Sequence, residues 1–391
     1  MSDLPRLPFE RHSPLDIAPM YTELQAKAPI SRVRTPAGDV AWLVSGYEEA
    51  KKLFADPRLG RSHPEPDRAP RISGSVLTGG PLGDHDTEHD YHTRMRRLLV
   101  PAFSARRMKA LSGHVAELVD GLLTRMATLT PPVDLHEKLS FPLPAMVLCE
   151  LLGVPFDDRA HFRALADGMA DMSDPARSRK AQAEMLEYTG GLLAAKRAHP
   201  TEDVFSDLAA GDFTVEEAAL LAAGLLFAGH ETTVNRIDYG VLFLLTDPAQ
   251  RDALVADPTR APALVEEILR MAAPGQLGLS RYAHDDIEIG GVTIRRGEAV
   301  VIYSSAANRD ARTFHDPNRF DMDRESPEPH IAFGYAAHYC IGAGLARVEL
   351  QAVFGTLFQR FPTLTLATPL DRLTERTDRI SGGLTELPVT W

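Results

Sequence analysis

The sequence predicts a mainly helical fold with small β-sheets, and three observations support this prediction. From about residue 92 to residue 272, apolar residues recur mostly at helical spacing. A further helical pattern covers about 342–361 and ends before a proline. Strand-like runs are short and lie at 40–44 and within 285–305. Because no linker-like segment divides the chain, we expect residues 1–391 to form one domain.

Composition restricts the classes of function. The chain has 391 residues and is 44% hydrophobic, so it can bury a large core and a bulky cofactor. Its formal charge of −12 and the lack of a long Lys/Arg run argue against binding to nucleic acid or anionic membrane. No segment is typical of a signal peptide or a membrane span. Two cysteines cannot form a disulfide framework, so we expect a cytoplasmic protein.

The segment 61–90 is rich in Pro, Gly, Asp and His, and this composition predicts a long surface loop. Loops of this length in compact proteins are often lids or binding loops. Near the other end of the chain, three short strands are expected within 285–305, separated by turns at Gly290-Gly291 and Arg296-Gly297. The third of these strands is expected to include Ser305.

The clearest helix begins after Thr214, which forms a capping box with Glu217. It ends at Asp247-Pro248, which makes it about 33 residues or about 50 Å long. The helix is apolar nearly all round, so it is expected to run through the core.

Midway along this helix lies the run AGHETT, residues 228–233. Ala228 and Thr232 are four residues apart and share a face, where a flat ligand can approach the backbone and meet a hydroxyl. Glu231 is an acid in an apolar helix, which is costly unless the side chain is paired, hydrated or functional. By itself the run fits a polar contact between helices equally well.

A second group of polar residues occupies the run FGYAAHYCIG, residues 333–342, which opens a helix. The N-terminus of a helix favours the thiolate of Cys340, and a thiolate is a strong ligand of heme iron. Gly342 allows the backbone to approach a ring closely. Cys340 alone is better explained as a structural cysteine. A zinc site with His338 lacks further ligands at suitable spacing.

A third signal is the pair Glu267 and Arg270, whose i,i+3 spacing places both side chains on one helix face. Such pairs are usually surface decoration. However, the three motifs occur in one chain together with ANRD at 307–310 and PNRF at 317–320. In this order they resemble the cytochrome P450 family over essentially the whole chain, and the joint match is very specific.

The resemblance implies a cytochrome P450 fold, with heme b between the long central helix and the cysteine loop. Cys340 resembles the axial thiolate, with Phe333 beside the sulfur. Glu231 and Thr232 resemble the acid–alcohol pair that delivers protons to dioxygen. Both residues being present favours a monooxygenase driven by a reductase over a relative driven by peroxide.

Other roles also follow from the resemblance. Glu267, Arg270 and Arg319 resemble a buried ion triad that supports the cysteine loop, and burial would make this triad costly to break. Cations are expected to bind the two heme propionates; these are His92, Arg96, Arg281 and His338.

One departure from the family pattern concerns the cysteine loop. The family usually has Gly three residues after the Phe, where this chain has Ala336. If the turn keeps its shape, Ala336 sits in a strained backbone region at a cost of about 1 kcal/mol. The segment before His92 also lacks the usual Pro-rich entry, so the resemblance does not fix where that helix starts.

The resemblance implies a small organic substrate and two electrons from separate partners. No flavin or iron–sulfur segment is fused to the chain, so we expect a ferredoxin and a ferredoxin reductase as donors to a monomer. Bacterial secondary metabolism is the expected setting. The substrate, and the choice between hydroxylation and oxidative coupling, stay open. Two other classes also remain: a heme-thiolate carrier or sensor, which would not need the Glu231–Thr232 pair, and a heme-free helical binding protein.

Overall fold

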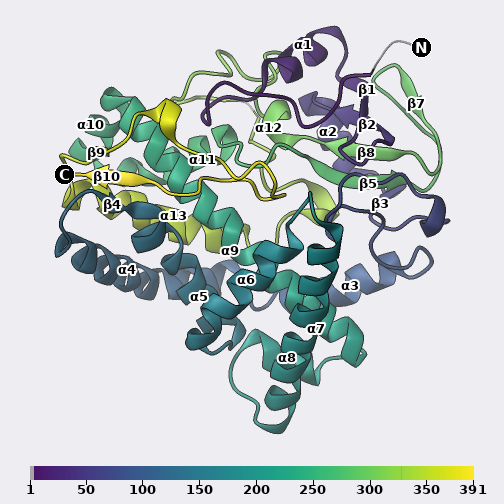
Figure 1. Ribbon diagram of the computed structural model, residues 1–391, viewed down its shortest axis with the longest axis horizontal. Helices are drawn as coiled ribbons and strands as arrows, with labels where there is room; N and C mark the ends of the chain where they lie inside the picture. The colour runs from purple at the N-terminus through teal and green to yellow at the C-terminus, as the bar shows by residue number, and fades with distance from the viewer. Residues whose placement is uncertain (1–3, 327) are drawn as a thin grey trace.

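The computed structural model describes residues 4–326 and 328–391, in which helices dominate, as predicted (Figure 1). The helices are α1 (Pro19–Lys27), α2 (Tyr47–Ala55), α3 (Glu88–Leu99), α4 (Ala105–Ala127), α5 (Pro142–Leu152), α6 (Arg159–Met169), α7 (Pro175–Ala198), α8 (Val204–Ala210), α9 (Val215–Thr246), α10 (Pro248–Ala256), α11 (Ala261–Met271), α12 (Ser304–Ala307) and α13 (Ala343–Arg360). None of the helices in this part of the chain is both long and apolar enough to cross a membrane.

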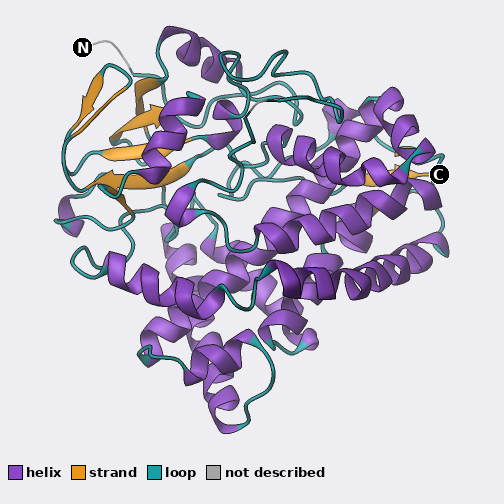
Figure 2. Cartoon of the chain, turned by 180° about the vertical axis from the view of Figure 1, so that it is seen from behind, coloured by secondary structure: helices purple, strands orange, loops and turns teal. Residues whose placement is uncertain are grey.

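The strands form three small sheets, which lie mostly to one side of the helices (Figure 2). The largest has the order β1-β2-β8-β5-β3, in which only β2 and β8 are parallel. The strands are β1 (Ile30–Arg34), β2 (Val40–Val44), β3 (Leu59–Gly60), β4 (Val133–Asp134), β5 (Leu279–Ala283), β6 (Ile287–Ile289), β7 (Val292–Ile294), β8 (Ala299–Ile302), β9 (Thr365–Leu366) and β10 (Pro388–Thr390).

The long helix α9 has the predicted ends. The Thr214 hydroxyl accepts a hydrogen bond from the Glu217 amide at 3.1 Å, and the Glu217 carboxylate accepts one from the Thr214 amide at 2.9 Å. These two bonds satisfy amides that the first helical turn leaves free. Asp247 ends α9 and caps α10, which starts at Pro248. The limits of α9 therefore follow from capping chemistry visible in the sequence.

The third strand of 285–305 is shorter than predicted. β8 ends at Ile302, and Ser304–Ala307 forms the short helix α12, so the strand prediction for Tyr303–Ser305 is wrong. The Tyr303 amide makes the last bond to Val44, at 3.0 Å. After it, the Asn308 amide bonds the Ser304 carbonyl at 2.8 Å. β2 ends at Val44, so the chain after Tyr303 has no further residue of β2 to pair with and forms a helical turn instead.

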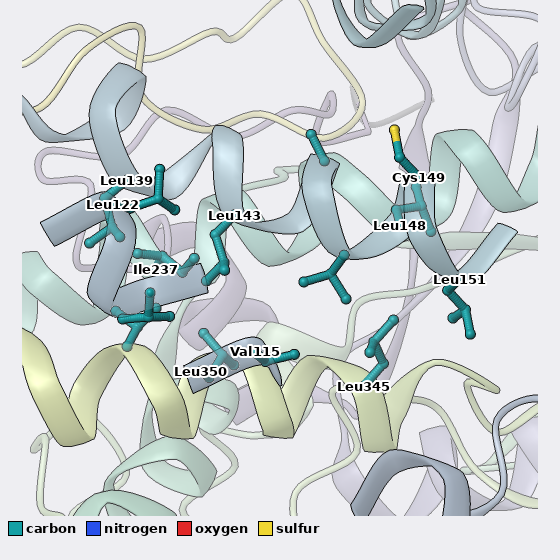
Figure 3. Packing of buried hydrophobic residues seen from close by; sticks show 14 of the residues in the cluster. Val115, Leu122, Leu139, Leu143, Leu148, Cys149, Leu151, Ile237, Leu345 and Leu350 are labelled. Carbon is teal, nitrogen blue, oxygen red and sulfur yellow. The ribbon is translucent and has the colours of Figure 1, made fainter. Parts of the chain in front are cut away.

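The main hydrophobic core joins α4, α5, α9 and α13 (Figure 3). Val115, Leu143, Ile237 and Leu350 point toward one another from these four helices, and each is fully buried. The helix that follows the cysteine loop is thus anchored on one side by close packing. This packing fixes where the loop at its N-terminus lies.

Residues 61–87 form a long loop with one short 3₁₀ turn at Pro66–Arg68, so the loop prediction for 61–90 is confirmed except at 88–90, where α3 has already begun. The segment is not a surface loop throughout, because Ile72 and Ser75 are fully buried. The Ser75 hydroxyl donates to the Met169 carbonyl at 2.6 Å, at the end of α6. The loop is therefore tied to the connection between α6 and α7.

Candidate active site

The cysteine loop is a tight turn that ends where α13 begins. The Cys340 amide donates to the Phe333 carbonyl at 2.9 Å, which closes the loop. Ala336 has φ of +56°, so the predicted strained backbone is confirmed. Glycine adopts this left-handed conformation without a side-chain clash, which explains why Ala336 is an unfavourable residue here.

The side chain of Cys340 is accessible, yet burial raises the pKa of its thiol. The amides of Gly342 and Ala343 and the charges of Arg96 and Arg347 act in the opposite direction. The sulfur is therefore accessible to a ligand, although the surrounding protein atoms limit its hydration. Its surroundings offer amide hydrogens and positive charge, both of which favour a thiolate.

The central helix α9 has one open face. Gly224, Ala228 and Thr232 are exposed, although most residues around them on this helix are buried or partly buried. These positions are four apart and share one side of the helix. No neighbouring atom lies within 4 Å of a Cβ placed on Gly224. The Thr232 hydroxyl donates to the Ala228 carbonyl at 2.9 Å, so it stands over this face.

Glu231 is adjacent to Thr232 but is only 3% exposed. Its Oε2 accepts a hydrogen bond from Arg376 at 3.0 Å. Its Oε1 lies 3.7 Å from Nδ1 of His230 and has no hydrogen-bond partner among the residues that the structure describes. The acid expected to deliver protons is therefore paired inside the protein and does not lie on the open face.

The four predicted propionate partners lie around the same region. The rings of His92 and His338 have centroids 4.3 Å apart. Burial and, to a smaller extent, the charges of His92 and Arg281 together lower the pKa of His338 to about 4. Arg96 donates to the Tyr339 carbonyl at 3.0 Å. Cations crowded in this way favour an anion between them.

Arg61 belongs to the same group of cations and was missed in the sequence. Burial lowers its pKa, and burial lowers that of Arg281 to about 10. Neither guanidinium forms an ion pair within residues 4–326 and 328–391. Arg61 lies in a loop with no periodic pattern, so the sequence carried no signal for it.

The predicted ion triad is correct in two of its three members. Arg270 makes two hydrogen bonds of 2.7 Å to Glu267, and both side chains are buried. The prediction for Arg319 is wrong, because its side chain is 66% exposed and lies 3.5 Å from Asp321. Arg324 takes its place, 3.1 Å from Glu267 with a side chain only 11% exposed.

The reason for this exchange is the backbone of Arg319. Its carbonyl accepts hydrogen bonds from Arg324 at 2.6 Å and from Arg270 at 3.2 Å. With the carbonyl turned inward, the side chain of Arg319 points to solvent. Arg324 follows five residues later and reaches Glu267 from the same turn. The motif PNRF thus marks the right segment but not the residue that makes the contact.

Another cation lies close to the open face of α9. Arg236 is one turn beyond Thr232, is partly buried, and has a pKa lowered to about 10 by burial. It makes no ion pair or side-chain hydrogen bond in the described part of the chain. The sequence places Arg236 on a helix but does not reveal that it lacks a partner.

These residues fit a flat, anionic, iron-containing group such as heme. The open face of α9 leaves space that protein atoms do not fill, and Cys340 offers an accessible soft ligand. The cations around His338 would neutralise two carboxylates. The Glu267–Arg270–Arg324 cluster holds the segments on either side in place, since Arg270 also donates to the carbonyls of Asn308 and Pro317.

Comparison with known proteins agrees with this geometry. Residues 259–380 match the family model described as cytochrome P450. The chain is 46% identical to pentalenolactone synthase of Streptomyces exfoliatus, and the match covers 100% of both chains. It is 41% identical to a cytochrome P450 BJ-1 homolog of Sinorhizobium fredii, over 99% of each.

Solved structures give the same result. A putative thioether synthase, SgvP, involved in tailoring griseoviridin, is 36% identical and superposes with a TM-score of 0.92 over 100% of both chains. PimD, an epoxidase of the polyene macrolide pimaricin, is 40% identical, with a TM-score of 0.87 over 100% of both chains. The similarity thus extends over the whole chain in sequence and in structure.

Proposed function

The chain belongs to the cytochrome P450 family, and on this premise we propose that it is a heme-thiolate monooxygenase of bacterial secondary metabolism. It takes two electrons from separate redox partners and uses dioxygen to oxidise a small organic substrate. Relatives named for pentalenolactone, griseoviridin and pimaricin support a natural-product substrate. Hydroxylation, epoxidation and oxidative coupling are all compatible with this proposal.

One observation carries the proposal. Cys340 is accessible at the N-terminus of α13, on a loop that is closed by the hydrogen bond from its amide to the Phe333 carbonyl. We assign Cys340 as the iron ligand of heme b, with Gly342 supplying an amide near the sulfur. When bound, the heme would supply iron-centred activation of dioxygen, and the thiolate would donate electron density to it. His92, Arg96, Arg281 and His338 would hold the propionates.

The side chains on the central helix prepare the site for proton transfer. Thr232 presents a hydroxyl whose bond to the Ala228 carbonyl can be exchanged for one to a ligand on the open face. The Glu231 carboxylate is paired with Arg376 and is shielded from water by burial. An acid next to a hydroxyl can pass a proton to that hydroxyl from outside the cavity. The small side chain of Ala228 would leave room for the heme and its ligands beside α9.

The partners and setting are proposed from the same reasoning. A ferredoxin with its reductase would supply electrons to a monomer, because the two cysteines of this chain are too few for an iron–sulfur cluster in addition to the heme ligand. We also propose one domain spanning residues 1–391 and a cytoplasmic location. Size-exclusion chromatography tests the monomeric state. Reconstitution with a bacterial ferredoxin and its reductase tests the proposed electron donors.

The absorption difference spectrum of dithionite-reduced protein, with and without carbon monoxide, tests the central proposal. A strongly red-shifted Soret band is expected, and Cys340→Ala should abolish it. Cys149→Ala is the matched control, because Cys149 is buried in the core and should leave the band unchanged. A band at the position of a histidine-ligated heme, or no heme band after expression with ample heme, would overturn the proposal.

A further inference from the structure

The carboxylate of Glu231 is held from a distant part of the sequence. Arg376 donates to its Oε2 at 3.0 Å, although 145 positions separate the two residues. The Arg376 side chain is 15% exposed, and its Nε is buried without a partner in the described residues. A cation this poorly hydrated depends on its carboxylate partners, so the pair is expected to be firmly held.

Arg376 also approaches a second carboxylate. Its Nη1 lies 3.7 Å from Asp167 on α6. Burial raises the pKa of Asp167, and the charge of Glu231 raises it further. Two carboxylates thus share one guanidinium, and Asp167 is the more open of them, with 31% of its side chain exposed. Other charged or titratable groups near this cluster are Arg163 on α6, Arg379 in the C-terminal segment, His230 on α9, and His136 in the π-helical turn before α5, which pairs with Asp238.

The segment that carries Arg376 also holds the connection between α6 and α7. In this C-terminal hairpin, residues 375–384, the Ile380 amide donates to the Ala170 carbonyl at 3.1 Å. The Met172 amide donates to the Asp378 carbonyl at 2.9 Å. Arg379 adds an ion pair of 3.1 Å with Asp171. The hairpin therefore contacts α6 through Arg376 and the α6–α7 connection through Arg379, and of these two arginines only Arg376 contacts Glu231.

We propose that Arg376 is a positioning residue for Glu231, and that Asp167 makes this position depend on the packing of α6 against the C-terminal hairpin. The inference rests on the proposed function, in which Glu231 supplies protons. When α6 is packed against the C-terminal hairpin, Asp167 and Glu231 share the Arg376 guanidinium. Arg376 then orients Glu231 without being paired with it alone. If α6 moves away from the C-terminal hairpin, Asp167 loses its contact with Arg376. Glu231 is then the only carboxylate beside this guanidinium, and its orientation changes. Proton supply is thereby linked to a closed α6–α7 connection.

The variant Arg376→Gln tests this inference, and Arg379→Gln is its matched control. Dithionite-reduced holoprotein is mixed with air-saturated buffer, and its reoxidation rate is followed in H₂O and in D₂O. Hydrogen–deuterium exchange of residues 167–174 is measured on the resting protein. Both variants loosen the hairpin, so exchange of this segment should rise in both. Only Arg376→Gln should slow the proton-dependent reoxidation, by about tenfold, and change its solvent isotope effect.

Arg376→Lys keeps the charge and should return the isotope effect toward the wild-type value. If Arg376→Gln does not fold, Asp167→Asn replaces it and should also change the isotope effect, because it leaves Glu231 as the only carboxylate of Arg376. Equal behaviour of Arg376→Gln and Arg379→Gln, or a wild-type isotope effect in Arg376→Gln, would overturn the inference. The carbon monoxide band separates this outcome from failure of the proposed function, since it must persist in every variant.

Discussion

Glu231 and Thr232 are consecutive residues of α9, yet their side chains lie in different surroundings. Thr232 stands on the open face and bonds the Ala228 carbonyl, whereas Glu231 is 3% exposed and paired with Arg376. Successive residues of a helix point about 100° apart, so one position can face a ligand while the next faces the protein. An acid and an alcohol are thereby adjacent without both being in the cavity.

This arrangement predicts that Thr232→Val uncouples the enzyme. The change keeps the side chain's shape but removes the hydroxyl, so product formation with a surrogate such as 7-ethoxycoumarin should fall by about 10- to 100-fold relative to NADH consumed. Hydrogen peroxide released per NADH measures the loss. Thr233→Val is the control, because Thr233 is buried away from the open face. Equal coupling in the two variants contradicts the role of Thr232.

Replacing Ala336 by Gly is expected to stabilise the protein. Ala336 has φ of +56°, which Gly adopts without the steric cost of a Cβ. The free energy of unfolding in urea should rise by about 1 kcal/mol. Ala337 lies in the same turn, and φ there is not positive, so Ala337→Gly should not be stabilising. A neutral or destabilising Ala336→Gly would mean that the turn differs from the one described.

The finding that Arg324, and not Arg319, completes the ion triad can be tested by comparing two variants. Arg324→Ala leaves Glu267 with one cation fewer in a buried site, and this should cost about 3 kcal/mol or more and reduce heme retention. Arg319→Ala removes a side chain that is 66% exposed and should change stability by no more than about 0.5 kcal/mol. Thermal unfolding and heme content of the two purified variants decide between them. The reverse ranking would restore Arg319 to the triad.

Glu349 predicts how stability depends on pH. Burial raises its pKa to about 8 from an ordinary value of 4.5, and its Oε2 has no partner in the described chain. The folded protein therefore keeps this proton at pH values where the unfolded chain has lost it. Raising the pH from about 4.5 to about 8 should lower the free energy of unfolding progressively.

Glu349→Gln removes this proton equilibrium. Its free energy of unfolding at pH 8 should exceed that of the wild type by about 2–4 kcal/mol, and the difference should vanish near pH 4.5. Urea titrations at several pH values provide the measurement. Glu216→Gln is the control, because Glu216 is exposed in the first turn of α9. Identical pH profiles for wild type and Glu349→Gln would show that Glu349 ionises normally.

Replacing Arg236 by an apolar residue is expected to stabilise the folded protein. It has no ion-pair or side-chain hydrogen-bond partner in the described part of the chain, and burial lowers its pKa. Arg236→Met should raise the free energy of unfolding by about 1–3 kcal/mol, since a desolvated charge is replaced by an apolar chain of similar length. Arg270→Met should do the opposite, by about 3–5 kcal/mol, because it leaves Glu267 without its bidentate partner. Urea unfolding of the two variants tests the contrast.

The sequence by itself determined the local elements and the chemistry of the site. Capping residues define both ends of α9, and the open face of Ala228 and Thr232 follows from their spacing of four. Cys340 could be singled out because its motif occurs in order with four others. Such features depend on neighbouring residues along the chain, through backbone hydrogen bonds and helical periodicity, so a linear pattern contains them.

Only the tertiary structure decided which charges meet. Arg324 and not Arg319 reaches Glu267, and Arg376 holds Glu231 across 145 positions. Equally, the sequence could not show that Arg236 has no partner or that Tyr303 leaves the sheet. Ion pairs join side chains from separate elements, and their choice depends on which backbone carbonyls turn inward and how much water each site excludes. The direction of each carbonyl and the exclusion of water are determined only when the helices pack together.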